Sequence, residues 1–228
     1  MGLDFYISEV NTQSAAAKQL ANDYIQFCKT LTDSVENFMN APLSGKTYDS
    51  AKHYFSTVYP PLASGFILTC EALIEAHSKF PEEFQSTVDT CDVIEEQIKA
   101  EIAQGQTLLE MIARTMDKEK EPNLRTEQRY MGVQSSIQKN QEKLAKLYEF
   151  NADSPNLFAA FEAQLANLDA GLAEVEKGNA WNQGSGTFDI GQMNLAWSKS
   201  INQEWDKRQK KIDVLRAEKV IKSIENDL

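Results

Sequence analysis

The chain has 228 residues, with 34 acidic and 23 basic side chains, a net charge of −11, and only 10 glycines and 6 prolines. The acidic balance disfavours nucleic acid and anionic lipid as partners, and the scarcity of turn residues disfavours β-sandwiches and barrels. Two histidines and three cysteines leave little material for catalytic, metal or redox chemistry. We therefore expect no enzyme, no cofactor and no metal site in these residues.

The beginning of the chain lacks the basic and apolar regions of a cleavable signal peptide. The longest uncharged stretch, residues 54–70, contains Pro60-Pro61 and several hydroxyl groups. It is too short and too polar for a convincing transmembrane segment, so we expect no stable membrane span.

The first predicted helix is marked by apolar residues that stand seven apart, with a companion series between them. The first series is Leu3, Val10, Ala17, Tyr24, Leu31 and Phe38, and the companions are Tyr6, Leu20 and Phe27. This spacing predicts a long helix that packs along one seam. Pro42 and Gly45 predict its end in a turn, where Leu43 serves either as a packing residue or as a contact for another protein.

A second helix is expected from about Thr47, with breaks or bends at Pro60-Pro61 and Phe80-Pro81. The apolar spacing places a third helix from Phe84 to Met116, followed by a charged loop over 117–122.

A fourth helix is expected around 130–148, and Ser154-Pro155 has the residue types that start a fifth. Residues 178–191 contain four glycines and predict a loop, with room for a short β-ribbon. The last helix is expected from about Ile190 to the end, with no stop signal, as in the front part of a longer protein. The pattern as a whole predicts an elongated all-α bundle of about six helices, several longer than 30 residues, with a Leu-x-Gly turn between the first two.

The segment Leu43–Phe55 (LSGKTYDSAKHYF) resembles the LXG domain, as do Val58–Leu62 (VYPPL) and Phe80–Phe84 (FPEEF). The resemblance extends over essentially all of residues 1–228, although only the first hundred carry specific motifs. It implies the N-terminal, non-catalytic export-targeting domain of a toxin secreted by the type VII systems of Gram-positive bacteria, with the toxin domain outside this chain.

The same resemblance implies the partners. Family members bind one or two small helical-hairpin targeting factors, similar to Trp-x-Gly proteins, so that we expect a heterotrimer that engages the type VII machinery. Synthesis in the cytoplasm would be followed by export without a cleavable signal. One departure is that Tyr24 and Tyr148 are followed four residues later by Cys28 and Ala152, so neither forms a Tyr-x-x-x-Asp export motif.

Long apolar seams stay partly exposed unless further helices cover them, and these seams are our candidates for partner binding. The candidates on the seam of the first helix are Leu3, Tyr6, Val10, Leu20, Tyr24, Phe27, Leu31 and Phe38. The candidates on the last helix are Trp197 and Trp205. Internal packing is the alternative for each of them. Leu43 and Gly45 are the candidate turn motif.

Two other functions remain open for such a chain. An α-helical pore-forming toxin would use residues 54–70 to enter membranes, and a cytoplasmic coiled-coil scaffold would use the seams to form homo-oligomers. The three cysteines all fall on apolar faces, so we expect three buried, unreactive thiols.

Overall fold

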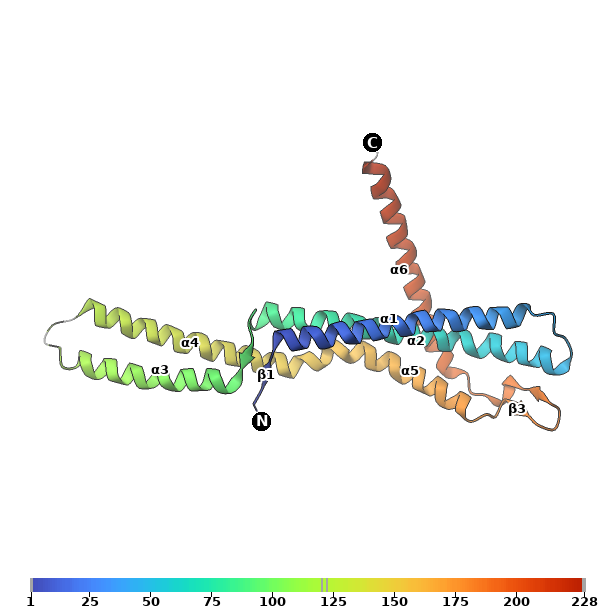
Figure 1. Cartoon of the computed structure of the whole chain (residues 1–228), viewed down its shortest axis with the longest axis horizontal. Helices are drawn as coiled ribbons and strands as arrows, with labels where there is room; N and C mark the ends of the chain where they lie inside the picture. The colour runs from blue at the N-terminus through green and yellow to red at the C-terminus, as the bar shows by residue number, and fades with distance from the viewer. Residues whose placement is uncertain (1, 120, 122, 227–228) are drawn as a thin grey trace. The chain divides into compact units, whose positions relative to one another are not determined.

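The computed structural model describes residues 2–119, 121 and 123–226. Most of these residues lie in α-helices, which confirms the all-α prediction (Figure 1). The helices are α1 (Ile7–Asn40), α2 (Lys46–Thr87), α3 (Glu95–Met116), α4 (Leu124–Asp153), α5 (Ala159–Glu176) and α6 (Ala196–Asn226). Of these, α1, α2 and α6 have 34, 42 and 31 residues.

The chain divides into two compact units, each built from two separate stretches of sequence. Unit 1 comprises Met1–Ala16 and His77–Leu157, and unit 2 comprises Ala17–Ala76 and Phe158–Leu228. The helices α1 and α2 therefore contribute residues to both units.

The core of unit 1 forms around aromatic rings from distant parts of the sequence. Phe5 stacks on Phe84 with ring centroids 3.5 Å apart, and Phe150 packs edge-on against Phe84 at 5.2 Å. Strand β1 (Asp4–Phe5) pairs antiparallel with β2 (Val93–Ile94), which places Phe5 opposite Val93. This pairing fixes the start of the chain beside the start of α3.

Glu95, the first residue of α3, is buried in unit 1 and accepts three hydrogen bonds. Its carboxylate receives the Leu3 amide at 2.6 Å, the Tyr148 hydroxyl at 2.6 Å and the Lys99 ammonium at 2.6 Å. The bond from Lys99, followed by those from Tyr148 and Leu3, lowers the pKa of Glu95 to about 2. The carboxylate thus holds β1, α3 and α4 together.

The core of unit 2 lies where α2, α6 and a short ribbon meet. Val58 and Ile201 are fully buried there, and the Tyr54 ring stacks on Phe188 at 4.7 Å. Phe188 belongs to β4 (Thr187–Phe188), which pairs with β3 (Trp181–Asn182) in the ribbon that the glycine-rich sequence allowed. The Phe188 amide donates to the Ser50 hydroxyl at 3.0 Å and ties the ribbon to α2.

The prediction of breaks in the second helix is wrong, because α2 continues through Pro60-Pro61 and Phe80-Pro81 to Thr87. A proline inside a helix costs about 3 kcal/mol through its missing donor and its clash with the preceding turn. Pro61 and Pro81 are both buried, as is Val58 one turn before the first pair. We infer that burial of these side chains offsets the helical cost.

Three predicted helix starts also need correction. Phe84 belongs to α2, and α3 begins only at Glu95 because β2 intervenes. Ser154–Phe158 form a 3₁₀ turn directly after α4, and α5 begins at Ala159. Ile190–Gln192 form another 3₁₀ turn, so α6 begins at Ala196.

The second half of α6 exposes its described side chains from Asp213 onwards to solvent. Every side chain from Asp213 to Ser223 is exposed, although Val214, Leu215, Val220 and Ile221 are apolar. The helix is attached through its first half, where Arg208 of α6 makes two hydrogen bonds of 2.7 and 2.5 Å to the carboxylate of Glu71 on α2.

Candidate partner-binding surface

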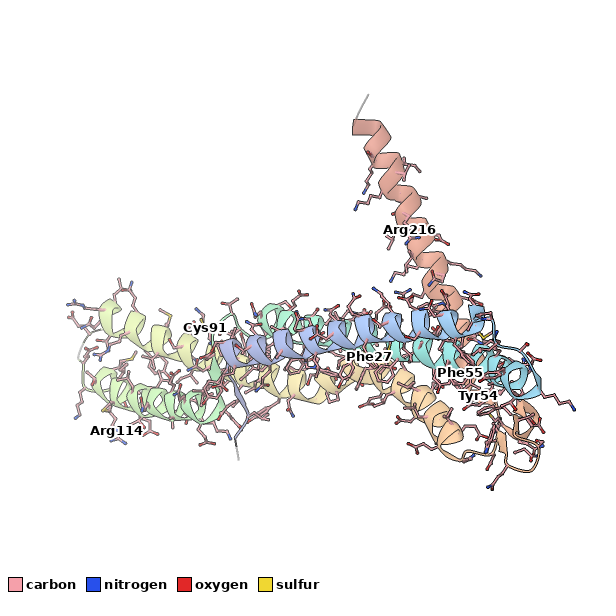
Figure 2. The ribbon with its side chains drawn as sticks, turned by 45° about the vertical axis from the view of Figure 1, so that its right-hand side comes forward. Phe27, Tyr54, Phe55, Cys91, Arg114 and Arg216 are labelled. Atoms are coloured by element: carbon pink, nitrogen blue, oxygen red, sulfur yellow. The ribbon has the colours of Figure 1, made fainter. Side chains whose placement is uncertain are left out.

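Three large apolar side chains of α1 in unit 2 point to solvent. Leu20, Tyr24 and Phe27 are 56%, 47% and 66% exposed. They are four and three residues apart, so they lie in a row along one face of the helix. We call these three residues the α1 ridge, and Figure 2 shows Phe27 on α1.

The inward face of α1, which lies roughly a quarter turn around the helix from the ridge, helps to explain why the ridge is exposed. Ala21 and Cys28 are the buried residues in this part of the helix, and both side chains are small. Small inward-facing residues let α1 approach its neighbours closely, and the larger side chains then have no interior left to enter. Tyr24 contacts Phe66 of α2 only at its side, with ring centroids 6.0 Å apart. Over residues 20–28 of α1, the large side chains Leu20, Tyr24 and Phe27 are thus exposed, whereas the small ones are buried.

A groove between α1 and α2 continues the ridge. It has a volume of about 260 Å³ and is lined mainly by Leu31, Val35 and Met39 of α1 and by Tyr59, Pro60 and Ala63 of α2. Leu31 is half-buried and follows Phe27 by one helical turn, so it joins the ridge to the groove. Beyond it, Phe38 of α1 packs on Phe55 of α2 at 5.2 Å. Ridge and groove together offer an apolar track for another helix.

The candidates at the start of the chain lie in unit 1 and differ among themselves. Leu3 and Val10 are half-buried against the core around Phe5, whereas Tyr6 is exposed. These three residues belong to unit 1, whereas the α1 ridge belongs to unit 2.

The two tryptophans of α6 have different environments. Trp197 is buried in the unit 2 core, where Gly171 of α5 lies beside its ring. Trp205 is half-buried, and the guanidinium of Arg208 lies 4.5 Å from its ring centroid. We therefore leave Trp197 out of the candidate surface, since its side chain is committed to internal packing.

The turn between α1 and α2 contains both candidate motif residues. Gly45 has φ of 115°, a conformation that favours glycine, and its carbonyl accepts the Asp49 amide at 2.8 Å at the start of α2. Leu43 is about half-exposed rather than enclosed by neighbours. The turn is built by the Gly45 backbone, and Leu43 remains available at the surface.

Sequence reasoning did not place Met39 or Tyr59 in the site. The signal that could have found them is the register of the two helices, because both residues lie on the facing sides of α1 and α2 that line the groove. Periodicity marks the apolar face of a single helix but gives no pairing between two helices.

The cysteine prediction holds for two thiols and is wrong for the third. Cys28 and Cys70 are buried, and burial raises the pKa of Cys28 and raises that of Cys70 to about 11. Such thiols stay protonated and unreactive at neutral pH. Cys91 is exposed, because it lies in the link between α2 and α3 and not on a helix face.

Comparisons with known proteins identify the family of this chain. A family profile described as "LXG domain of WXG superfamily" matches residues 4–187. A Bacillus cereus protein named "Toxin" is 36% identical over 208 residues, which cover 88% of this chain and 37% of the relative. The chain therefore belongs to the LXG domain family of the WXG superfamily. It spans little more than a third of the length of the relative that it matches.

Proposed function

We propose that this chain is the non-catalytic targeting domain of an antibacterial toxin that is exported by a type VII secretion system. Membership of the LXG family and the similarity to a protein named "Toxin" support this proposal. The relative is much longer than the matched region, which leaves room in such a protein for a separate toxic domain.

The observation that carries the proposal is the α1 ridge with its adjoining groove. A helical-hairpin partner can lay one helix along Leu20, Tyr24 and Phe27 and insert an apolar side chain into the groove beyond Leu31. These three side chains are already about half buried, so covering the rest of them contributes roughly 2–5 kcal/mol before the costs of association. Apolar side chains of the partner that become buried at the same contact add to this gain.

In this mechanism the targeting domain does no chemistry. One or two small helical proteins cover its apolar surfaces in the cytoplasm, and the resulting heterotrimer presents a composite export signal to the secretion machinery. The half-buried Trp205 of unit 2 and the exposed Tyr6 of unit 1 are separate, secondary candidates for contacts with a second partner. The toxin then leaves the cell together with its targeting domain.

The test is binding of the purified chain to the small helical proteins encoded beside its gene, measured by calorimetric titration. Phe27→Asp and Tyr24→Asp should each weaken binding about thirtyfold or more, which corresponds to about 2 kcal/mol at a central apolar contact. Leu31→Asp should also weaken binding. Because Leu31 is half-buried, the thermal unfolding of this variant must be measured alongside, to separate lost binding from lost stability.

Leu124→Asp provides a matched control. Leu124 lies at the start of α4 in unit 1 and is 67% exposed, almost the same as Phe27. The control should bind the partner as the unaltered chain does. Equal affinities for Phe27→Asp and the unaltered chain would contradict the proposed surface.

A further inference from the structure

The α3–α4 hairpin of unit 1 is a two-helix element with one internal seam. The helices lie side by side and antiparallel, as Figure 1 shows at its green end. Ile112 and Ile137 are buried in the seam, and a Cβ at Gly105 would come within 2.7 Å of Ile137. Gly105 thus lets the two helices approach closely. A pair of helices can bury only the side chains between them, so its outer faces remain uncovered.

One outer face of this hairpin carries a continuous groove. Two hollows of about 560 and 480 Å³ share Leu108 and Arg129, so they run into each other along the hairpin. The apolar floor includes Val133 and Met111, and the Met111 side chain is 53% exposed. We call this feature the hairpin groove. It reaches from Glu101 and Asn140 at one end to Thr115 and Asn123 at the other.

The two ends of the hairpin groove have opposite charge. Glu101 lies at one end, where it accepts a 2.8 Å hydrogen bond from the Asn140 amide group. Arg125 lines the other end, and Arg129 lies between the centre and that end. Within the described residues neither arginine has a carboxylate partner within ion-pair distance. The groove therefore offers an acidic end and an unpaired basic end.

We propose that the hairpin groove is an interface between two copies of this chain, packed face to face and antiparallel as a four-helix bundle. A two-fold axis at the level of Leu108 and Gly132 brings the charged ends together. Leu108 of α3 and Gly132 of α4 mark the middle of the groove. Glu101 is seven residues from Leu108, towards one end of the groove, and Arg125 is seven residues from Gly132, towards the other end. At 1.5 Å per residue both lie about 10 Å from the axis, so Arg125 of each copy reaches the level of Glu101 of the other.

A second copy fits this groove better than a generic helix because the groove is complementary to itself. The parallel arrangement lacks this advantage, since the arginines of both copies would gather at one end. Residues 95–153 contain 11 acidic and 9 basic side chains, so this hairpin is nearly neutral in a chain with a net charge of −11. Repulsion between two acidic copies is therefore weakest here.

The surface also permits close approach. A Cβ added at Gly132 would have no described atom within 4 Å beyond the local helix backbone, so the centre of the groove is open to a facing helix. The groove spans about 20 Å of helix length. An interface of this size is at the small end for specific complexes, so we expect dimers with a micromolar dissociation constant.

Sedimentation equilibrium of the full chain tests the proposal through a charge swap. Arg125→Glu alone and Glu101→Arg alone each place like charges together and should weaken self-association at least tenfold. An equimolar mixture of the two variants restores both opposite-charge pairs and should form a heterodimer with close to the original affinity. High salt should reduce the differences in dissociation constant between the single variants, their mixture and the unaltered chain.

A steric variant gives an independent readout. Gly132→Tyr fills the centre of the groove and should leave a folded monomer, because among the described residues no atom outside the local helix backbone lies within 4 Å of the added Cβ. Ala145→Tyr, at an exposed position of α4 outside the groove lining, should still dimerise. A chain that stays monomeric at several hundred micromolar and low salt overturns the proposal. Dimers that survive Gly132→Tyr, or single charge variants that associate as tightly as their mixture, overturn it too.

Discussion

A single carboxylate, Glu95, links three elements of unit 1. Its oxygens accept the Leu3 amide, the Tyr148 hydroxyl and the Lys99 ammonium, and the side chain is buried. Nothing in the sequence marks this glutamate apart from Glu96 beside it. The difference arises only when β1 pairs with β2 and brings the Leu3 amide to α3.

The lowered pKa of Glu95 predicts a pH dependence of stability. The folded-state pKa is about 2, below the ordinary value of 4.5, so the unfolded chain takes up the proton first as the pH falls. The stabilisation is complete above about pH 5 and is lost as the pH falls towards 2. Glu95→Gln should lower the free energy of unfolding at pH 7. It should also make the decrease of that free energy between pH 5 and pH 2 less steep.

Urea midpoints measured from pH 7 to pH 2.5 check this prediction. Glu96→Gln is the control, because the Glu96 side chain is 74% exposed and lies 3.7 Å from the same lysine. A Glu95→Gln protein whose urea midpoint falls with pH as steeply as that of the unaltered chain would rule out this role for Glu95.

Two helical glycines differ sharply in the space around them. A Cβ at Gly171 of α5 would lie 2.7 Å from the Trp197 ring and 2.9 Å from Leu62, whereas Gly132 of α4 has open space. Gly171→Ala should therefore lower the free energy of unfolding by about 1–3 kcal/mol through overpacking. Gly132→Ala should instead raise it by about 0.5–1 kcal/mol, since alanine is the better helix former. Chemical denaturation of both variants distinguishes these outcomes, and equal changes at the two positions would refute the packing argument.

At the scale of elements, α2 shows where local rules give the wrong result. Pro60-Pro61 and Phe80-Pro81 predict breaks or bends, yet the helix runs without a break from Lys46 to Thr87. The cost of each proline is a local property that can be read from the sequence. Whether a proline side chain becomes buried, as those of Pro61 and Pro81 are, depends on tertiary packing, which the sequence pattern alone does not reveal.

The helix α2 also contains an 18-residue window with a mean hydropathy of 1.3, apolar enough by length and composition to cross a membrane. This corrects the expectation that the region is too polar for such a span. Within the structure 44% of the window is buried. Val58, Ile67 and Leu68 of α2 are among the buried apolar side chains of the protein.

This burial predicts that α2 does not insert into membranes while unit 2 is folded. The chain at micromolar concentration should release no dye from phosphatidylcholine vesicles, with or without phosphatidylglycerol, at pH 7. A known pore-forming peptide serves as the positive control. Release that scales with the concentration of the folded chain would favour the pore-forming alternative over the targeting role.

At the scale of the whole molecule, the all-α class and the family were predictable from the sequence. Heptad spacing marks α1, and the residues around Leu43 and Gly45 carry the family resemblance that the match over residues 4–187 confirms. Part of the candidate surface was also predictable, since Leu20, Tyr24 and Phe27 belong to the heptad seam.

Helical spacing could not tell which of its apolar positions are exposed and which are buried. Trp197 and Phe27 both have helical spacing, but one fills a core and the other points to solvent. The outcome depends on which neighbours share the unit, and this chain assembles each unit from two separate stretches. Contacts between residues so far apart leave no signature in local periodicity.

The unequal burial of the three thiols has a practical consequence. Cys28 and Cys70 are enclosed and held in the protonated form, whereas Cys91 is open to solvent between α2 and α3. A maleimide fluorophore added briefly at neutral pH should attach at Cys91 alone. The natural chain thus has a built-in labelling position in unit 1, from which energy transfer to a dye on a bound partner can report distances without any engineered substitution.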